Sequence, residues 1–128
     1  MVIEDTAMDN FYEKINEECG VRFPFSDEQD WEWCAGDPNH TSDYIAFYDK
    51  YSDDMDKWQK YLAVNLIIQG IEDLMEQGED QSIIDDLWSE TKKILLKDDH
   101  RYSIGVWSCG DQEPEECWLI TPKMRELL

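Results

Sequence analysis

Apolar positions along the chain recur mainly at the three- and four-residue spacing of helices. The two clearest cases are residues 54–77 and residues 82–98. In the first segment, apolar residues occupy most of the circumference, which predicts a central buried helix that Gly78 ends. In the second, Asp85 and Asp86 lie in the first turn and lysines lie near the end, which complements the helix dipole. The inner face of the second helix is predicted to consist of Ile84, Leu87, Trp88, Thr91, Ile94 and Leu95. The pattern therefore predicts two long central helices.

Two shorter segments have the same periodicity. Residues 6–20 predict a helix, because Thr6 offers a capping-box-like start and Gly20 a stop. A further short helix is predicted, with Thr41 or Ser42 as its cap and four aromatic residues on one face. These residues are Tyr44, Phe47, Tyr48 and Tyr51. The intervening residues favour extended and turn structure.

Near the end of the chain the period changes from helical to two. The runs "YSIGVWSC" (102–109) and "ECWLIT" (116–121) predict strands, and a polar loop with Gly and Pro joins them. Because a lone hairpin is marginal in water, this one should pack on the helices or pair with the extended segment "VRFPF". We therefore expect an α+β fold, namely a mainly helical single domain over residues 1–128 with two long central helices and a C-terminal β-hairpin.

The composition indicates a folded domain with an unusual charge. The 128 residues include six Trp and six Tyr, which is enough apolar surface for a core. Asp and Glu number 31 against 11 Lys and Arg, so the net charge is −20, and the N-terminal half is the more negative. Such a chain repels nucleic acid and anionic membranes. We therefore expect neither nucleic acid nor a membrane as a partner. We expect a basic protein surface instead.

The N-terminal residues lack the positive start and apolar run of a signal peptide, and no apolar stretch is long enough to cross a bilayer. In the absence of an export signal we expect a cytoplasmic protein whose cysteines are reduced thiols. These cysteines are Cys19, Cys34, Cys109 and Cys117.

Three acidic clusters are predicted to bind the partner. The first lies in "SDEQDWEWC" and interleaves carboxylates with two indole rings: Asp27, Glu28, Asp30, Trp31, Glu32 and Trp33. The second surrounds two tyrosines: Asp49, Asp53, Asp54 and Asp56. The third lies in the predicted hairpin loop: Asp111, Glu113, Glu115 and Glu116. Aromatic rings within a polar rim serve as anchors in protein interfaces, which favours Trp31 and Trp33 as contact residues. Trp58, Tyr61 and Trp88 have helical spacing and are predicted to lie in the core.

The candidates for catalysis are few. His100 follows Asp98 and Asp99 and resembles half of an acid–base pair, although a histidine near a helix terminus is also favoured by the dipole alone. The cysteines lack the C-x-x-C spacing of a zinc site. Residues 37–43 have oxygen ligands at alternating positions but lack the glycine and glutamate of a calcium loop. We therefore predict a protein that is not an enzyme, with no catalytic residues, metal or cofactor.

In its small, acidic whole-chain profile, and in segments such as "SDEQDWEWC" and "YDKYSDDMDKW", the chain resembles the immunity proteins of bacterial toxin–immunity systems, including those of contact-dependent growth inhibition. The resemblance implies a one-to-one complex with the C-terminal toxin domain, such as a nuclease, inside the producing cell. Three alternatives stay open. One is a phage-type DNA mimic that inhibits a restriction or CRISPR enzyme, and another is a small metal-dependent hydrolase that uses His100. The third is an acidic housekeeping domain with no dedicated partner.

Overall fold

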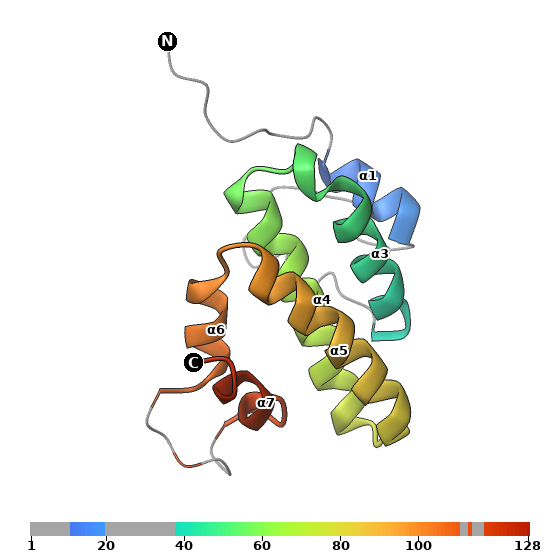
Figure 1. Cartoon of the computed structure of the whole chain (residues 1–128). Helices are drawn as coiled ribbons and strands as arrows, with labels where there is room; N and C mark the ends of the chain where they lie inside the picture. Colours follow the sequence, from blue (N-terminus) through green and yellow to red (C-terminus); the bar gives the residue numbers. More distant parts are fainter. Residues whose placement is uncertain (1–10, 20–37, 111–112, 114–116) are drawn as a thin grey trace. The chain divides into compact units, whose positions relative to one another are not determined.

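The structure of the chain, a computed structural model, describes residues 11–19, 38–110, 113 and 117–128 (Figure 1). All regular structure in these residues is helical. The elements are α1 (Phe11–Cys19), η1 (Pro38–His40), α3 (Thr41–Tyr51), η2 (Ser52–Asp54), α4 (Lys57–Glu76), α5 (Gln81–Lys97), α6 (Arg101–Trp107) and α7 (Thr121–Arg125). The α+β prediction is therefore wrong, whereas the two long predicted helices correspond to α4 and α5.

The chain divides into two compact units, Met1–Gly70 and Ile71–Leu128, and the division falls within α4. The single domain stays a prediction. No helix in the described parts of the chain is both long enough and apolar enough to span a membrane.

In the first unit, α1 packs against α3 through apolar side chains. Phe11 and Ile15 of α1 are buried, and the Phe11 ring meets the Phe47 ring edge-on at 6.0 Å between centroids. Tyr44 and Tyr48 are fully buried. The aromatic stripe predicted for this helix is thus mostly core. The predicted cap at Thr41 or Ser42 is wrong, because α3 begins at Thr41 and its N-cap residue is His40, which makes no side-chain capping hydrogen bond.

Two local features fix the course of α4. The Asp56 carboxylate accepts the Gln59 backbone N–H at 2.8 Å, and the Gln59 side-chain oxygen accepts the Asp56 N–H at 3.3 Å. This reciprocal capping box satisfies donors at the start of the helix. Further along, Gly70 lies so close to Thr41 that a Cβ atom at residue 70 would be 2.2 Å from the Thr41 hydroxyl oxygen. Close approach of the two helices explains a glycine in the helix interior.

In the second unit, α5 is amphipathic. Its inner face consists of Ile84, Trp88, Thr91, Ile94 and Leu95, all buried. The sequence predicted this face, including the burial of Trp88. The turn before α5 contains Gly78 with φ of +75°, a left-handed conformation that favours glycine, as its predicted role as a helix stop requires.

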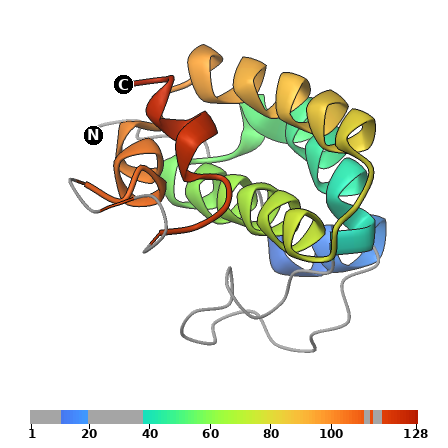
Figure 2. The same cartoon turned by 90° about the horizontal axis from the view of Figure 1, so that it is seen from below.

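The C-terminal part of the second unit contains no strand among its described residues. The first predicted strand is mostly a helix, and residues 117–120 of the second form a bend and a turn before α7. Residues 101–107 form α6, and α7 follows and packs against it (Figure 1 and Figure 2). In α6 the buried residues Ser103, Ile104 and Trp107 have helical spacing. A short apolar run fits both periods, so periodicity alone does not separate a strand from a helix.

A disulfide joins Cys109 to Cys117, with 6.0 Å between their Cα atoms. The prediction of reduced thiols is therefore wrong for these two cysteines. Spacing along the sequence did not reveal that they converge, because the pairing depends on the path of the chain between α6 and α7. Cys19 is a free, buried thiol.

Candidate functional site

The structure describes only some of the predicted partner-binding residues. The first cluster, residues 27–33, lies outside the described residues, as do Asp111, Glu115 and Glu116 of the third. Glu113 is described and exposed. The whole second cluster is described: Asp49, Asp53 and Asp54 are exposed and Asp56 is half-buried. The site can therefore be built only around the second cluster.

The second cluster lies beside an exposed indole ring that the sequence placed in the core. Trp58, in the first turn of α4, is 58% exposed, so its core assignment is wrong. Its ring stacks on the half-buried Tyr61 ring, with centroids 5.1 Å apart and planes 21° apart. We name Asp53, Asp54, Trp58 and Tyr61 the acidic–aromatic turn. Apolar residues around most of α4 suggested all-round burial, but Trp58 lies in the first helical turn, next to solvent.

Buried residues anchor the backbone of the acidic–aromatic turn. Ser52 and Met55 flank the two exposed aspartates and are themselves buried, with 3% of each side chain accessible. The Met55 backbone N–H donates to the Ser52 carbonyl oxygen at 3.3 Å, which closes the 3₁₀ turn. Buried residues on both sides hold Asp53 and Asp54 on a fixed backbone, as recognition by a preorganised surface requires.

The acidic character of this region is local. Asp56 uses its carboxylate to cap α4, so its first role is structural. Lys57 and Lys60 follow directly in the sequence and bring positive charge to the same helical turn. Asp53 and Asp54 remain as exposed carboxylates, a few residues before Trp58 in the sequence. The turn is therefore a small anionic spot next to a ring rather than a broad acidic face.

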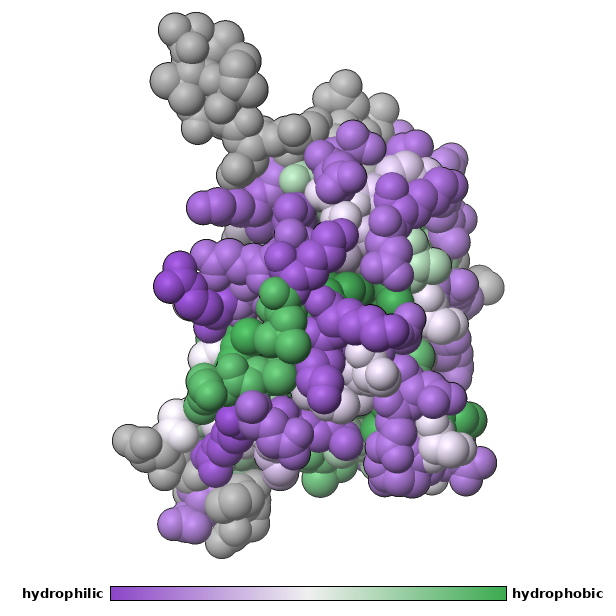
Figure 3. All heavy atoms as spheres, viewed as in Figure 1, coloured by the Kyte–Doolittle hydropathy of each residue, from purple (hydrophilic) through white to green (hydrophobic). Residues whose placement is uncertain are grey.

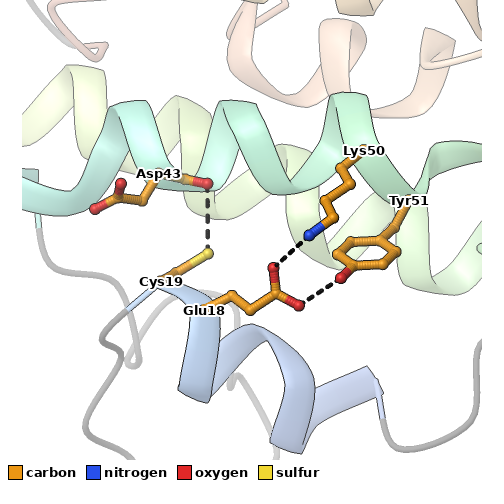
Figure 4. A network of polar contacts seen from close by, with 5 residues as sticks. All are labelled: Glu18, Cys19, Asp43, Lys50 and Tyr51. Atoms are coloured by element: carbon orange, nitrogen blue, oxygen red, sulfur yellow. Dashed lines mark hydrogen bonds and ion pairs between the residues drawn. The ribbon is translucent and has the colours of Figure 1, made fainter.

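Tyr51, which the second cluster was predicted to surround, belongs to a clamp between α1 and α3 (Figure 4). Its hydroxyl donates to Glu18 at 2.5 Å, and Lys50 donates to the other Glu18 oxygen at 3.5 Å. Lys14 and Lys50 each lie 5.0 Å from the Tyr51 ring centroid. The Tyr51 hydrogen bond, assisted by the charges of the two lysines, lowers the pKa of Glu18. The same hydroxyl and the Glu18 charge raise the pKa of Lys50. Tyr51 thus holds α1 in place.

Cys19, at the end of α1, also contacts α3. Its thiol donates to the Asp43 carbonyl oxygen at 3.4 Å (Figure 4). Burial, together with the negative charges of Asp43 and Glu18, raises the pKa of Cys19 to about 12. Since the thiolate is the reactive form, this thiol is inert near neutral pH.

A second acidic region, which was not predicted as a site, lies at the junction of α4 and α5. No Lys, Arg or His occurs between residues 61 and 91. We name its exposed carboxylates the acidic tip: Glu76, Glu79, Asp80, Asp85 and Asp86. Ile83, which is 43% exposed, lies among them in the sequence. The long run without a base was visible in the sequence, but Asp85 and Asp86 were explained there by the helix dipole alone.

The acidic tip is partly neutralised. Lys123 approaches Asp85 at 3.7 Å, and the Gln81 amide donates to the same carboxylate at 2.8 Å. Both contacts lie within the second unit. The tip also lacks an exposed aromatic ring of the kind that Trp58 provides, so of the two acidic regions the acidic–aromatic turn has the better composition for an interface.

The sequence offered His100, next to Asp98 and Asp99, as half of an acid–base pair. His100 is buried, with 6% of its surface accessible, and precedes α6. The Asp99 carboxylate makes a two-point contact with the Arg101 guanidinium, at 3.0 Å for each nitrogen, and this contact raises the pKa of Arg101. Among the described residues, no three His, Cys, Asp or Glu side chains gather into a group that could hold a metal ion.

No protein-family model matches the chain, and no curated protein and no solved structure matches it. The resemblance to immunity proteins therefore stays a prediction based on the sequence profile.

Proposed function

We propose that the protein binds and neutralises a basic protein partner, in the manner of an immunity protein that inhibits a toxin nuclease. The observation that supports this proposal is the acidic–aromatic turn. It combines an exposed indole ring, supported from one side by Tyr61, with two exposed carboxylates on an anchored backbone. The position of Trp58 in the first turn of α4 accounts for its exposure. What favours a binding role is the combination of this ring with the stacked Tyr61 ring and with carboxylates close by in the sequence.

Binding would proceed in two physical steps. The net charge of −20 attracts a cationic protein over distances of about one Debye length, roughly 8 Å at physiological salt, and raises the association rate. Once the surfaces meet, a lysine or arginine of the partner stacks on the Trp58 ring while Asp53 and Asp54 neutralise its charge. Such a cation–π contact contributes about 0.5–2 kcal/mol, depending on how far water is excluded.

The carboxylates would also account for inhibition. A nuclease binds the phosphate backbone through Lys and Arg side chains. An acidic protein that occupies these side chains competes directly with the substrate. The inhibitor then needs no catalytic group of its own.

The test begins with capture of the partner from native cells on the immobilised protein at two salt concentrations, followed by kinetics with the captured partner. Trp58→Ala should accelerate dissociation, and Asp53→Asn with Asp54→Asn should slow association, because the ring acts in the complex and the charges act during approach. Tyr102→Ala is the matched control, since Tyr102 is 71% exposed on α6. Asp85→Asn with Asp86→Asn is the control for charge.

The proposed site fails if Trp58→Ala and Tyr102→Ala have the same effect on dissociation. Electrostatic attraction fails if the association rate is equal at low and high salt. A captured restriction or CRISPR enzyme would instead support the DNA-mimic alternative, which depends on the same surface physics.

A further inference from the structure

The bond between Cys109 and Cys117 stands at the end of α6 and before the turn that leads into α7. Both residues are half-buried, so a reductant can reach the sulfur atoms. Cys109 has φ of +68°, a left-handed conformation that residues other than glycine rarely adopt. The bond therefore lies in an accessible place directly after α6, where the Cys109 backbone N–H also donates to the Val106 carbonyl oxygen at 3.2 Å.

Next to this bond lies a pair of indole rings. The Trp118 ring contacts the Trp107 ring at 4.6 Å between centroids, with 49° between the planes. Trp107 is fully buried and Trp118 is 36% exposed. On its N-terminal side Trp118 is tethered by the disulfide of Cys117. On its C-terminal side it is tethered by the backbone N–H of Leu119, which donates to Glu72 at 3.1 Å.

The attachment of α7 does not depend on the disulfide. The Thr121 hydroxyl donates to the Trp107 carbonyl oxygen at 2.9 Å. Arg125 donates to the Ser108 carbonyl at 2.8 Å and to the Gly110 carbonyl at 3.3 Å, which satisfies acceptors at the end of α6. Ile120 donates its backbone N–H to Glu72 at 2.9 Å. These contacts would persist after the sulfur–sulfur bond opens.

We propose that the Cys109–Cys117 disulfide is a reversible redox switch that holds Trp118 against Trp107. A thiolate of a dithiol reductant attacks one sulfur and forms a mixed disulfide with it, which releases the other cysteine as a thiol. The second thiol of the reductant then displaces the remaining cysteine. The protein gains two electrons and two protons and becomes a dithiol, while the reductant becomes a cyclic disulfide. Trp118 is then tethered from one side only and leaves Trp107.

This inference is independent of the proposed function and concerns a different part of the chain. Cys19 would take no part, because burial raises the pKa of its thiol to about 12.

The experiment uses the full chain with Cys34→Ser, so that the thiol of Cys34 cannot react. Tryptophan emission and far-ultraviolet circular dichroism are recorded during titration with dithiothreitol and during reoxidation. Alkylation followed by mass spectrometry counts the free thiols. We expect a shift of emission to longer wavelength on reduction, recovery on oxidation and unchanged helical dichroism. Trp118→Phe should abolish the emission shift without affecting thiol release, and Cys109→Ser with Cys117→Ser should show the reduced-state emission at all times.

Three results would overturn the switch. Loss of helical dichroism on reduction would show that the bond stabilises the fold of the whole unit. Unchanged emission after alkylation of both cysteines would show that Trp118 keeps its place. Alkylation of both cysteines without reductant would mean that the bond does not form in the purified protein.

Discussion

Carboxylates have opposite roles in two regions of this molecule. In the acidic–aromatic turn of the first unit, Asp53 and Asp54 point to solvent beside an exposed indole ring. In the second unit, Glu72 is buried and accepts two backbone N–H groups, from Leu119 and Ile120. The fold thus uses Glu72 as a structural acceptor, whereas Asp53 and Asp54 remain available to a partner.

The surfaces near these carboxylates differ in the same way. Around Glu72 the polar atoms are paired, and α7 is attached by side chains that satisfy backbone groups. The surface also exposes apolar side chains, and Figure 3 shows some of them gathered into a patch with hydrophilic residues around it. Exposure alone therefore does not indicate function. An exposed ring is informative when carboxylates and a supporting ring lie beside it, as at Trp58.

The largest difference between the two kinds of carboxylate is expected when Glu72, the buried acceptor, is removed. Glu72→Ala should lower the free energy of unfolding by about 1–3 kcal/mol, because it leaves the buried Ile120 N–H and the part-buried Leu119 N–H without their acceptor. Chemical denaturation measures this loss. Glu76→Ala is the matched control, since Glu76 lies one helical turn further on and is exposed. Equal losses for the two variants would contradict the structural role of Glu72.

Glycine substitutions test the packing of the first unit against an open helix position. Gly70→Ala should destabilise by about 1–3 kcal/mol, because its Cβ would collide with the Thr41 hydroxyl. Gly105→Ala in α6 should instead stabilise by about 0.4–1 kcal/mol, since nothing lies within 4 Å of its Cβ and the unfolded chain loses freedom. Thermal unfolding of both variants checks the signs. A stabilising Gly70→Ala would show that α3 and α4 do not approach closely there.

The pH dependence of stability should differ in sign between two glutamates. Burial raises the pKa of Glu72 above its usual 4.5, so its contribution is greatest below pH 4.5 and declines as the pH rises through the raised pKa. The Tyr51 hydrogen bond lowers the pKa of Glu18, so its contribution is present above pH 4.5 and is lost as the pH falls through the lowered pKa.

Denaturation at a series of pH values, for the natural protein, Glu72→Gln and Glu18→Gln, separates the two contributions. Glu72→Gln should flatten the decline above pH 4.5, and Glu18→Gln should flatten the loss below it. If both variants change the same limb of the profile, the assignment of the two opposite signs is wrong.

The smallest effect on stability is expected in the acidic–aromatic turn. Trp58→Ala should change the free energy of unfolding by less than about 1 kcal/mol, because the ring is mostly exposed and loses mainly its stacking on Tyr61. The measurement is chemical denaturation beside the binding kinetics described above. A loss as large as that of Glu72→Ala would assign Trp58 to the core and remove the basis of the proposed site.

Local patterns in the sequence were sufficient to predict several elements. The periodicity of α3, α4 and α5, the inner face of α5 and the stop at Gly78 were all predicted, because helices of this length repeat their pattern several times. The high net charge follows from composition alone and restricts the class of partner.

Features that depend on tertiary contacts could not be predicted from short or isolated signals in the sequence. The strand prediction failed for α6, where seven residues are too few to distinguish the two periods, and the pairing of Cys109 with Cys117 depends on the path between α6 and α7. Exposure of Trp58 and burial of Glu72 are equally invisible in the sequence. Burial of a residue depends on which elements pack over it, and those contacts join residues far apart in the chain.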